Sequence, residues 1–308
     1  MVLSELSPDA DKPIWLKLEI TQPTGSFKIR GATNAIAQLS DDERLRGVVC
    51  CSTGNHGRAV AYAASQFGTA ATVCLSHLVP DNKVKAIEKL GATVLRTGNS
   101  QDDAQRKADE LVRGEGLVEI PPFDHFDIVC GQGTIAIEVL EQEPDVETLL
   151  VPLSGGGLIS GIAIAAKALK PTIRIVGISM DRGAAMATSL AAGKPVEVTE
   201  FESLADSLGG GIGLDNRYTF AACRDLVDEV VLLSEEQIYR GMRVVCFEDR
   251  FVVEGGAAVA HAAILAGEVV IDGPTAVILS GRNVDPQQFA DVISNQPVKL
   301  GDLTVNGA

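Results

Sequence analysis

The segment TLLVPLSGGGLISG, residues 148–161, decides the fold class of this chain. It begins with a mainly apolar run of strand length, and the glycines at 155–157 separate this run from the apolar start of a helix. A strand, a glycine turn and a helix in this order indicate an α/β unit with a parallel sheet. Consecutive glycines also let the backbone close around a phosphate, because free N–H groups and the helix dipole complement its charge. The segment therefore predicts both a fold class and an anion site.

Outward from this segment, apolar runs of strand length alternate with helical patterns. The further strand-like runs are GVVC (47–50), AATVCL (70–75), ATVL (92–95), IRIVGIS (173–179) and TAVIL (275–279). The helical patterns place apolar residues on one face, as do Ala59, Val60, Ala63, Ala64 and Phe67, and Val84, Ile87 and Leu90 before Gly91. The alternation predicts an α/β protein with largely parallel sheets. Without a low-complexity linker or a repeat, a second lobe has to be formed by chain crossings.

Charge and apolar pattern exclude several classes of partner. The chain has 26 Lys and Arg against 41 Asp and Glu, a formal net charge of −15, which disfavours binding of nucleic acid or anionic lipid. The sequence has neither an apolar run of the roughly 20 residues that a membrane-spanning helix needs nor the start of a signal peptide. We expect a cytoplasmic protein that acts on a small molecule. The six cysteines lack CxxC spacing and nearby histidines, so we interpret them as reduced core thiols.

The first candidate catalytic residue is Lys28, in the segment GSFKIRG (25–31). It stands among small residues just before an apolar-periodic stretch at 32–39, which places it at the mouth of a predicted helix. A partly desolvated lysine in such a position is the type of amine that forms imines with carbonyl compounds. Taken alone, a solvated lysine on a surface helix is the more common case. The assignment therefore depends on the other motifs.

The second motif is CSTGNHG (51–57), directly after one strand-like run and before a helical pattern. Hydroxyls, an amide and backbone N–H groups converge there at a helix N-terminus, where a carboxylate or a ring oxygen can bind. An ordinary capping turn has the same composition. The motif is compatible with both interpretations.

Two further turns follow strands in the second half of the chain. SGGGLISG (154–161) has no lysine after its glycines and no convincing acidic residue about 20 positions on, so a phosphate without a nucleotide fits best. LSGRN (279–283) places Ser280 at the carboxyl end of a strand, where open α/β sheets bind ligands and a hydroxyl can bond a heteroaromatic nitrogen. By itself, this Ser-Gly pair is typical of a simple turn.

Together, SFKIRGA, STGNHG, SGGGLISG and SGRN resemble the motifs of the fold-type II pyridoxal-phosphate enzymes, the group of threonine and serine dehydratases and serine racemase. The four motifs occur in this order and together span nearly the whole chain. The details GRAVAYAA, SMDRGAAM and SGRNVD are most similar to hydroxyectoine-utilisation dehydratases. The resemblance implies two interwoven three-layer α/β/α lobes of the tryptophan synthase β-like architecture. Residues 1–46 and 126–308 would form a large cofactor-binding domain, and residues 47–125 a small substrate-closing domain.

The resemblance also implies a role for the residues of each motif. Lys28 would hold pyridoxal 5'-phosphate as a Schiff base and take the substrate proton, with Phe27 flanking the ring. Asn55 would bond the ring hydroxyl, and Ser280 would face the pyridine nitrogen. The phosphate would be cradled by Ser154, Gly155, Gly156, Gly157 and Leu158. The substrate carboxylate would be received by Ser52, Thr53, Gly54 and His56, and Thr53 matches the position of the second catalytic hydroxyl in serine racemase.

Two departures from the family pattern affect the expected site. Met180 and Met186 stand where many relatives have acidic ligands of a divalent metal, and thioethers are poor ligands for Mg²⁺ or Ca²⁺, so we expect no metal. Arg282 replaces a glycine that is common in relatives. Its guanidinium is either a surface group in a turn or a receptor for a second acidic group or a polar chain on the substrate.

The resemblance predicts a dehydratase or ammonia-lyase that acts by β-elimination. A serine hydroxyl does not keep the pyridine nitrogen protonated, which favours prompt loss of a β-substituent over a long-lived carbanion. The substrate would be a β-hydroxy amino acid, either threonine, serine, a 3-hydroxyaspartate or a hydroxyectoine-derived hydroxy amino acid, and the products a 2-oxo acid and ammonia. Relatives of this kind imply a homo-oligomer, a dimer or a tetramer. The alternatives are an amino-acid racemase that uses Lys28 and Thr53, and a non-catalytic sensor with the same fold.

Overall fold

The computed structural model describes residues 1–52, 54–79 and 81–306. The chain forms two compact units, a large unit of Met1–Thr21 with Gly133–Ala308 and a small unit of Gln22–Gln132. The family resemblance implies other bounds, a cofactor-binding domain of residues 1–46 with 126–308 and a substrate-closing domain of residues 47–125. That division stays a prediction.

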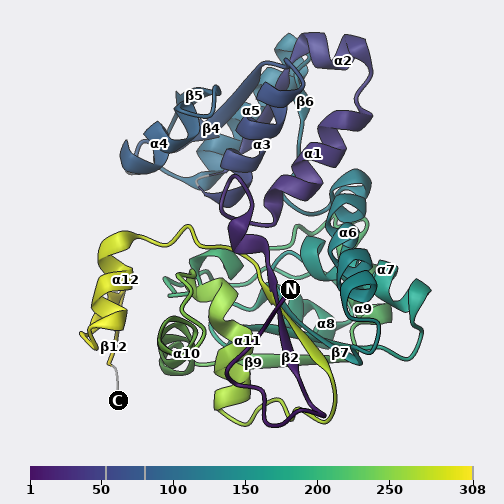
Figure 1. Cartoon of the computed structure of the whole chain (residues 1–308). Helices are drawn as coiled ribbons and strands as arrows, with labels where there is room; N and C mark the ends of the chain where they lie inside the picture. Colours follow the sequence, from purple (N-terminus) through teal and green to yellow (C-terminus); the bar gives the residue numbers. More distant parts are fainter. Residues whose placement is uncertain (53, 80, 307–308) are drawn as a thin grey trace. The chain divides into compact units, whose positions relative to one another are not determined.

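The large unit is built on a six-stranded sheet in the order β1-β2-β10-β7-β8-β9 (Figure 1). Only the edge pair of β1 and β2 is antiparallel; the other neighbours are parallel. Parallel neighbours need crossover connections, which explains why strands distant in sequence lie side by side. The strands are β1 (Val2–Leu3), β2 (Ile14–Leu18), β7 (Thr148–Pro152), β8 (Arg174–Met180), β9 (Glu229–Leu233) and β10 (Thr275–Leu279).

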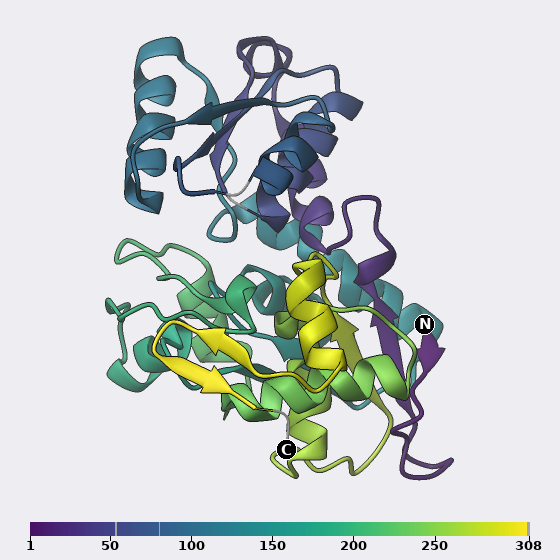
Figure 2. The ribbon, with the colours of Figure 1, turned by 90° about the vertical axis from the view of Figure 1, so that its left-hand side faces the viewer.

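One face of this sheet forms a continuous apolar core with helices α10 (Glu235–Phe247) and α11 (Gly255–Leu265). A capping box starts α10, because Ser234 accepts a hydrogen bond from the Gln237 N–H and the Gln237 side chain accepts one from the Ser234 N–H. Figure 2 shows the C-terminal hairpin of the same unit in yellow. The remaining elements are η1 (Glu19–Thr21), α7 (Gly157–Leu169), α8 (Ala185–Ala192), η2 (Asp206–Leu208), α9 (Thr219–Leu226), α12 (Pro286–Ile293), β11 (Val298–Leu300) and β12 (Leu303–Val305). Helix α6 (Phe126–Gln142) begins in the small unit and ends in the large unit, since the boundary lies after Gln132.

The small unit is built on a four-stranded parallel sheet in the order β5-β4-β3-β6. Because side chains alternate along a strand, Val48 and Cys50 face α1 and α3, whereas Val49 and Cys51 face α5. Helices therefore cover both faces, and the unit has three layers. Its elements are α1 (Lys28–Gln38), α2 (Asp41–Arg46), β3 (Val48–Cys51), α3 (Asn55–Gln66), β4 (Ala71–Leu75), α4 (Asp81–Glu88), β5 (Thr93–Arg96), α5 (Gln101–Glu115) and β6 (Val118–Glu119).

The predicted α/β class is confirmed, and all six strand-like runs form strands. Two details of the predicted core are wrong. Phe67, placed on the apolar face of its helix, is 40% exposed at the C-cap of α3. Cys130 is exposed and Cys246 is half-buried, whereas the other four cysteines are core thiols as expected.

Among the helices of the described residues, none is long and apolar enough to cross a membrane.

Candidate active site

Lys28 is the first residue of α1, as its motif predicted. The turn before the helix needs a glycine, because Gly25 has a φ of +76°. The Lys28 side chain is half-buried, and its Nζ donates a hydrogen bond of 2.6 Å to the carbonyl oxygen of Pro122. The same Nζ lies 5.5 Å from the centroid of the Phe27 ring. The amine is thus held at the helix mouth by a backbone carbonyl and an aromatic ring.

The second motif lies where β3 ends and α3 begins, also in the small unit. Gly54 is the N-cap of α3, and no described side chain caps that helix end. The Gly54 N–H is 3.3 Å from the hydroxyl oxygen of Ser52, which accepts its hydrogen bond. An uncapped helix N-terminus attracts anions. Thr53, predicted as a second catalytic group, lies outside the described residues.

His56 is buried in the first turn of α3. Its Nε2 lies 2.7 Å from the carbonyl oxygen of Ile120, so this nitrogen carries the proton. Burial, together with the charge of Lys28, lowers the pKa of His56 from 6.5 to about 3. The imidazole is therefore neutral at physiological pH and lies within electrostatic reach of the Lys28 amine.

The carbonyls of Ile120 and Pro122 are functional groups that the sequence analysis missed. They follow β6 and bind His56 and Lys28, so one short backbone segment positions both side chains. Backbone carbonyls carry no signature of their own in a sequence. The adjacent prolines at 121 and 122 are the one feature of the sequence that points to a special backbone here, since proline fixes the backbone and has no N–H of its own.

The glycine loop lies in the large unit, between β7 and α7. Gly156 is the N-cap of α7 in the left-handed conformation, with a φ of +87°, and no described side chain caps the helix. A Cβ atom at Gly156 would lie 2.8 Å from Cε of Met186 and 2.9 Å from Cβ of Thr219. Side chains of Met186 and Thr219 thus pack against the backbone of Gly156. A larger residue at this position would clash with them and would also have to adopt the left-handed conformation.

Ser280 directly follows β10, which is the neighbour of β7 in the sheet. Its side chain is buried, and Arg282, two residues later, is exposed. The loop 154–158 and Ser280 therefore both lie at the carboxyl edge of the same sheet, where parallel sheets bind ligands. The structure thus brings the predicted residues together in two groups, one in each unit.

Met180 and Met186 are buried in the large unit, with 1% and 2% of their surface exposed. Among the described residues, no three His, Cys, Asp or Glu side chains are grouped as metal ligands. The absence of a metal in this protein stays a prediction.

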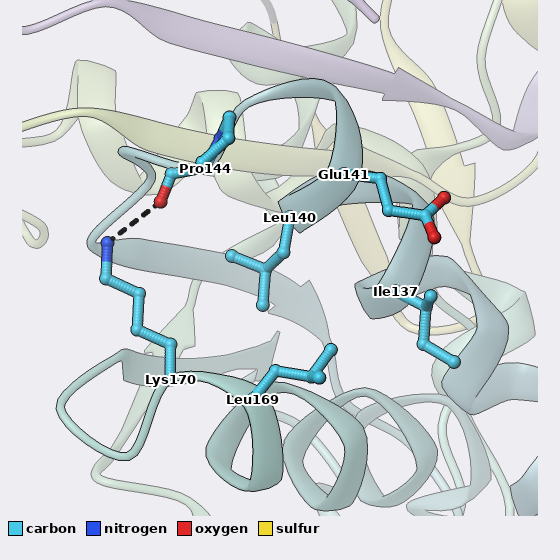
Figure 3. Close-up of a pocket in the computed structure, with 6 residues that line it drawn as sticks. All are labelled: Ile137, Leu140, Glu141, Pro144, Leu169 and Lys170. Carbon is cyan, nitrogen blue, oxygen red and sulfur yellow. Dashed lines mark hydrogen bonds between the residues drawn. The ribbon is translucent and has the colours of Figure 1, made fainter.

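A surface pocket of about 350 Å³ lies elsewhere on the large unit, between the ends of α6 and α7 (Figure 3). Its lining is mainly apolar, and the Lys170 amine donates to the carbonyl oxygens of Pro144 and Val146. None of the predicted site residues lines this pocket. We therefore do not assign it to the active site.

Comparisons with known proteins relate the chain to one family. It is 56% identical over 280 residues to a putative threonine dehydratase of Sinorhizobium fredii, covering 91% of this chain and 84% of that protein. It is 38% identical over 298 residues to the L-threonine ammonia-lyase of Thermotoga maritima, covering 97% of this chain and 74% of that protein. The structure of maize serine racemase matches with a TM-score of 0.86 and 34% identity, covering 92% of this chain and 87% of that one. The family model of the pyridoxal-phosphate dependent enzymes matches residues 2–281, and the chain belongs to this family.

Proposed function

We propose that this protein is a pyridoxal-phosphate-dependent dehydratase that releases a 2-oxo acid and ammonia from a β-hydroxy amino acid by β-elimination. The half-buried amine of Lys28, held by Pro122 next to the neutral His56, is the observation that carries the proposal. The relatives named as threonine dehydratase and threonine ammonia-lyase support the reaction type.

The described residues fit pyridoxal 5'-phosphate. The loop 154–158 offers a phosphate the N–H groups of an uncapped helix and the space left by its glycines. Ser280, at the same sheet edge, offers a hydroxyl to a ring nitrogen. In the small unit, Lys28 would form the covalent bond to the cofactor, with Phe27 and Asn55 as its ring contacts. A backbone site, a side-chain hydroxyl and an amine thus match a ligand with a phosphate, a ring nitrogen and an aldehyde.

The bound cofactor supplies the electron sink that makes cleavage of the substrate Cα–H bond feasible. The Lys28 amine would act as the base that takes the Cα proton of the substrate. The Pro122 carbonyl accepts a hydrogen bond from the amine and keeps it oriented, and the neutral His56 adds no positive charge that would resist protonation of Lys28. The segment 52–56 binds the substrate carboxylate through the N-terminus of α3.

A racemase is the second candidate, because the maize serine racemase has the same fold with 34% identity. Racemisation would use Lys28 and Thr53 on opposite faces of the substrate. It would interconvert L- and D-serine without release of ammonia, whereas elimination releases ammonia in proportion to the 2-oxo acid.

Three finer statements belong to the same proposal. The segments GRAVAYAA, SMDRGAAM and SGRNVD support a closeness to hydroxyectoine-utilisation dehydratases, and hence a hydroxyectoine-derived hydroxy amino acid as one candidate substrate. We further propose that the protein is cytoplasmic and assembles as a homo-oligomer, a dimer or a tetramer. Gel filtration with light scattering tests the assembly.

The test of the proposed function is Lys28→Ala. Wild-type protein should absorb visible light, retain the cofactor on Lys28 after borohydride reduction, and release ammonia and a 2-oxo acid from a hydroxy amino acid. Lys28→Ala should lose the covalent label and all turnover, because no other group would form the bond or take the proton. Lys89→Ala is the control, since Lys89 is exposed on the surface of the small unit. Turnover by Lys28→Ala would contradict the proposal.

A further inference from the structure

Helix α9 packs against α7 in the large unit, beside the glycine loop (Figure 1). Its first residue, Thr219, is fully buried, and a Cβ atom at Gly156 would lie 2.9 Å from the Thr219 Cβ. Cys223, one turn later, is also buried, and its Sγ would lie 3.1 Å from the same atom. The first turn of α9 therefore limits where the backbone of the glycine loop can lie.

A buried hydroxyl joins the two helices. Ser160, one turn after Gly156 on α7, is fully buried, and its hydroxyl donates a hydrogen bond of 3.3 Å to the carbonyl oxygen of Thr219. The Ser160 N–H donates to the carbonyl oxygen of Gly156 at 2.8 Å. Ser160 thus binds the glycine loop through its backbone and α9 through its side chain.

Asn216 holds the first turn of α9 through its side-chain amide. The Asn216 Nδ2 donates to the hydroxyl oxygen of Thr219 at 2.8 Å and to the carbonyl oxygen of Ile212 at 2.9 Å. Its Oδ1 accepts a hydrogen bond of 2.8 Å from the Phe220 N–H, one of the N–H groups at the helix start that have no partner within the helix. One amide thus makes three of the four hydrogen bonds open to it, and all three fix the approach of the chain to Thr219.

These polar groups are not required for packing alone. Replacing both partners of a buried hydrogen bond by apolar groups of the same shape is often nearly neutral for stability. A fully satisfied polar network instead specifies one arrangement of the groups that it joins. Binding of a phosphate by backbone N–H groups depends on their direction, because a hydrogen bond weakens steeply away from a straight geometry. A small displacement of Gly156 should therefore affect phosphate binding more than folding.

We propose that Asn216, Thr219 and Ser160 are positioning residues for the cofactor phosphate. Thr219 contacts Gly156, and hydrogen bonds from Asn216 and Ser160 hold its hydroxyl and its carbonyl group in place. The N–H groups of the loop 154–158 are thereby directed toward the phosphate. The three side chains act through the loop and need no contact with the cofactor. This inference rests on the proposed function, which places the phosphate at this loop.

The experiment measures the affinity of the apoprotein for pyridoxal 5'-phosphate and for pyridoxal, which lacks the phosphate. Thr219→Val keeps the branched shape but removes the acceptor of the Asn216 amide. It should weaken binding of pyridoxal 5'-phosphate roughly tenfold or more, the effect of losing one hydrogen bond to a charged group, and leave binding of pyridoxal almost unchanged. Thr219→Ser keeps the hydroxyl and should bind both ligands as the wild type does.

Thr275→Val is the matched control. Thr275 is fully buried, and its hydroxyl donates a hydrogen bond of 2.9 Å to the carbonyl oxygen of Gly273. It begins β10, so it lies at the end of the sheet opposite to the glycine loop. Thr275→Val loses a buried hydroxyl in the same way as Thr219→Val, but it should keep the affinity of the wild type for both ligands.

Asn216→Ala is a second variant, at a half-buried position where a smaller side chain is tolerated more easily. It should show the same selective loss of affinity for pyridoxal 5'-phosphate. Phosphorus NMR of the bound cofactor gives a further readout. The phosphate signal should shift in Thr219→Val and Asn216→Ala, and it should stay in place in Thr219→Ser and Thr275→Val.

Three outcomes would overturn the inference. Equal losses for the two ligands in Thr219→Val would mean a general structural role. Equal losses in Thr219→Val and Thr219→Ser would assign the effect to packing of the side chain. Unchanged affinity in both Thr219→Val and Asn216→Ala would remove the network from phosphate binding. Wild-type protein that binds pyridoxal as tightly as pyridoxal 5'-phosphate, or full cofactor affinity in Gly156→Ala, would instead contradict the proposed phosphate site itself.

Discussion

His56 makes the folding stability depend on pH. Its pKa is lowered from 6.5 to about 3 by burial, with the nearby charge of Lys28. In the unfolded chain the imidazole binds a proton near pH 6.5, whereas the folded protein excludes that proton until about pH 3. The unfolded state thus binds more protons in this window, so the free energy of unfolding falls as the pH falls through it. We expect His56→Asn to remove up to about 1.4 kcal/mol per pH unit of this dependence, measured by urea unfolding between pH 6 and pH 4.

The matched control for this prediction is His77→Asn. His77 is exposed, so this variant makes the same change of side chain away from the buried site. Asparagine at position 56 keeps an N–H group that can donate to the Ile120 carbonyl, which limits the structural damage. A slope that is the same in His56→Asn and in wild type would mean that the folded protein accepts the proton at His56.

The sequence shows which side chains are available, but not which backbone carbonyls accept their hydrogen bonds. Lys28 was identified from its neighbours, and the structure places it at the first residue of α1 as expected. Its carbonyl partner Pro122 is 94 residues away, and a carbonyl oxygen is common to every residue. Long-range contacts of this kind depend on the path of the chain after β6, which local patterns do not encode.

The backbone geometry of the glycine loop requires a glycine at position 156. Gly156→Ala would place a Cβ in a left-handed residue, at a cost of about 1–2 kcal/mol, and against Met186 and Thr219. Because the N–H groups of α7 would move, we expect the affinity of the apoprotein for pyridoxal phosphate to fall at least tenfold. An absorbance titration measures this affinity.

Gly193→Ala separates the two effects of that substitution. Gly193 ends α8 with a φ of +72°, but no atom lies within 4 Å of an added Cβ. It should therefore lose stability through backbone strain while keeping the cofactor affinity of the wild type. Equal cofactor affinities in Gly156→Ala and Gly193→Ala would contradict a cradle at the glycine loop.

Strands were predicted from continuous apolar runs, both in the interior of a sheet and at its edge. β3 is apolar throughout, and β7 and β10 are apolar after a first threonine, since helices cover both faces of a parallel sheet. The edge strand β5 was predicted although it is partly exposed, whereas the interior strand β2, interrupted by Lys17, and the edge strand β9, with alternating exposure, were not. The order of the strands within each sheet was not predictable. A strand has the same apolar run whichever strand lies next to it, and the connections between strands do not specify their neighbours.

Each of the two units has apolar clusters of its own among the described residues. The core of the large unit draws on both ends of the chain, from Ile14 to Val305. The two clusters of the small unit, one on each face of its sheet, include no residue before Ile29 or after Ile128. Sequence patterns showed that such cores exist, but not which segments share one, since that depends on chain crossings.

Residues 22–132 should therefore fold as an isolated fragment, although the large unit requires two separate segments of the chain. The fragment contains a complete three-layer arrangement and exceeds the size below which domains need disulfides or metals for stability. We expect a cooperative urea transition by circular dichroism. We also expect slow thiol labelling at Cys50, Cys51 and Cys74, because burial raises the pKa of Cys51 to about 12 and that of Cys74 to about 11. Val73→Asp, at a fully buried position of β4, should abolish both signals. Rapid labelling of Cys50, Cys51 and Cys74, together with unfolding without cooperativity, would show that the small unit depends on the rest of the chain, despite having its own core.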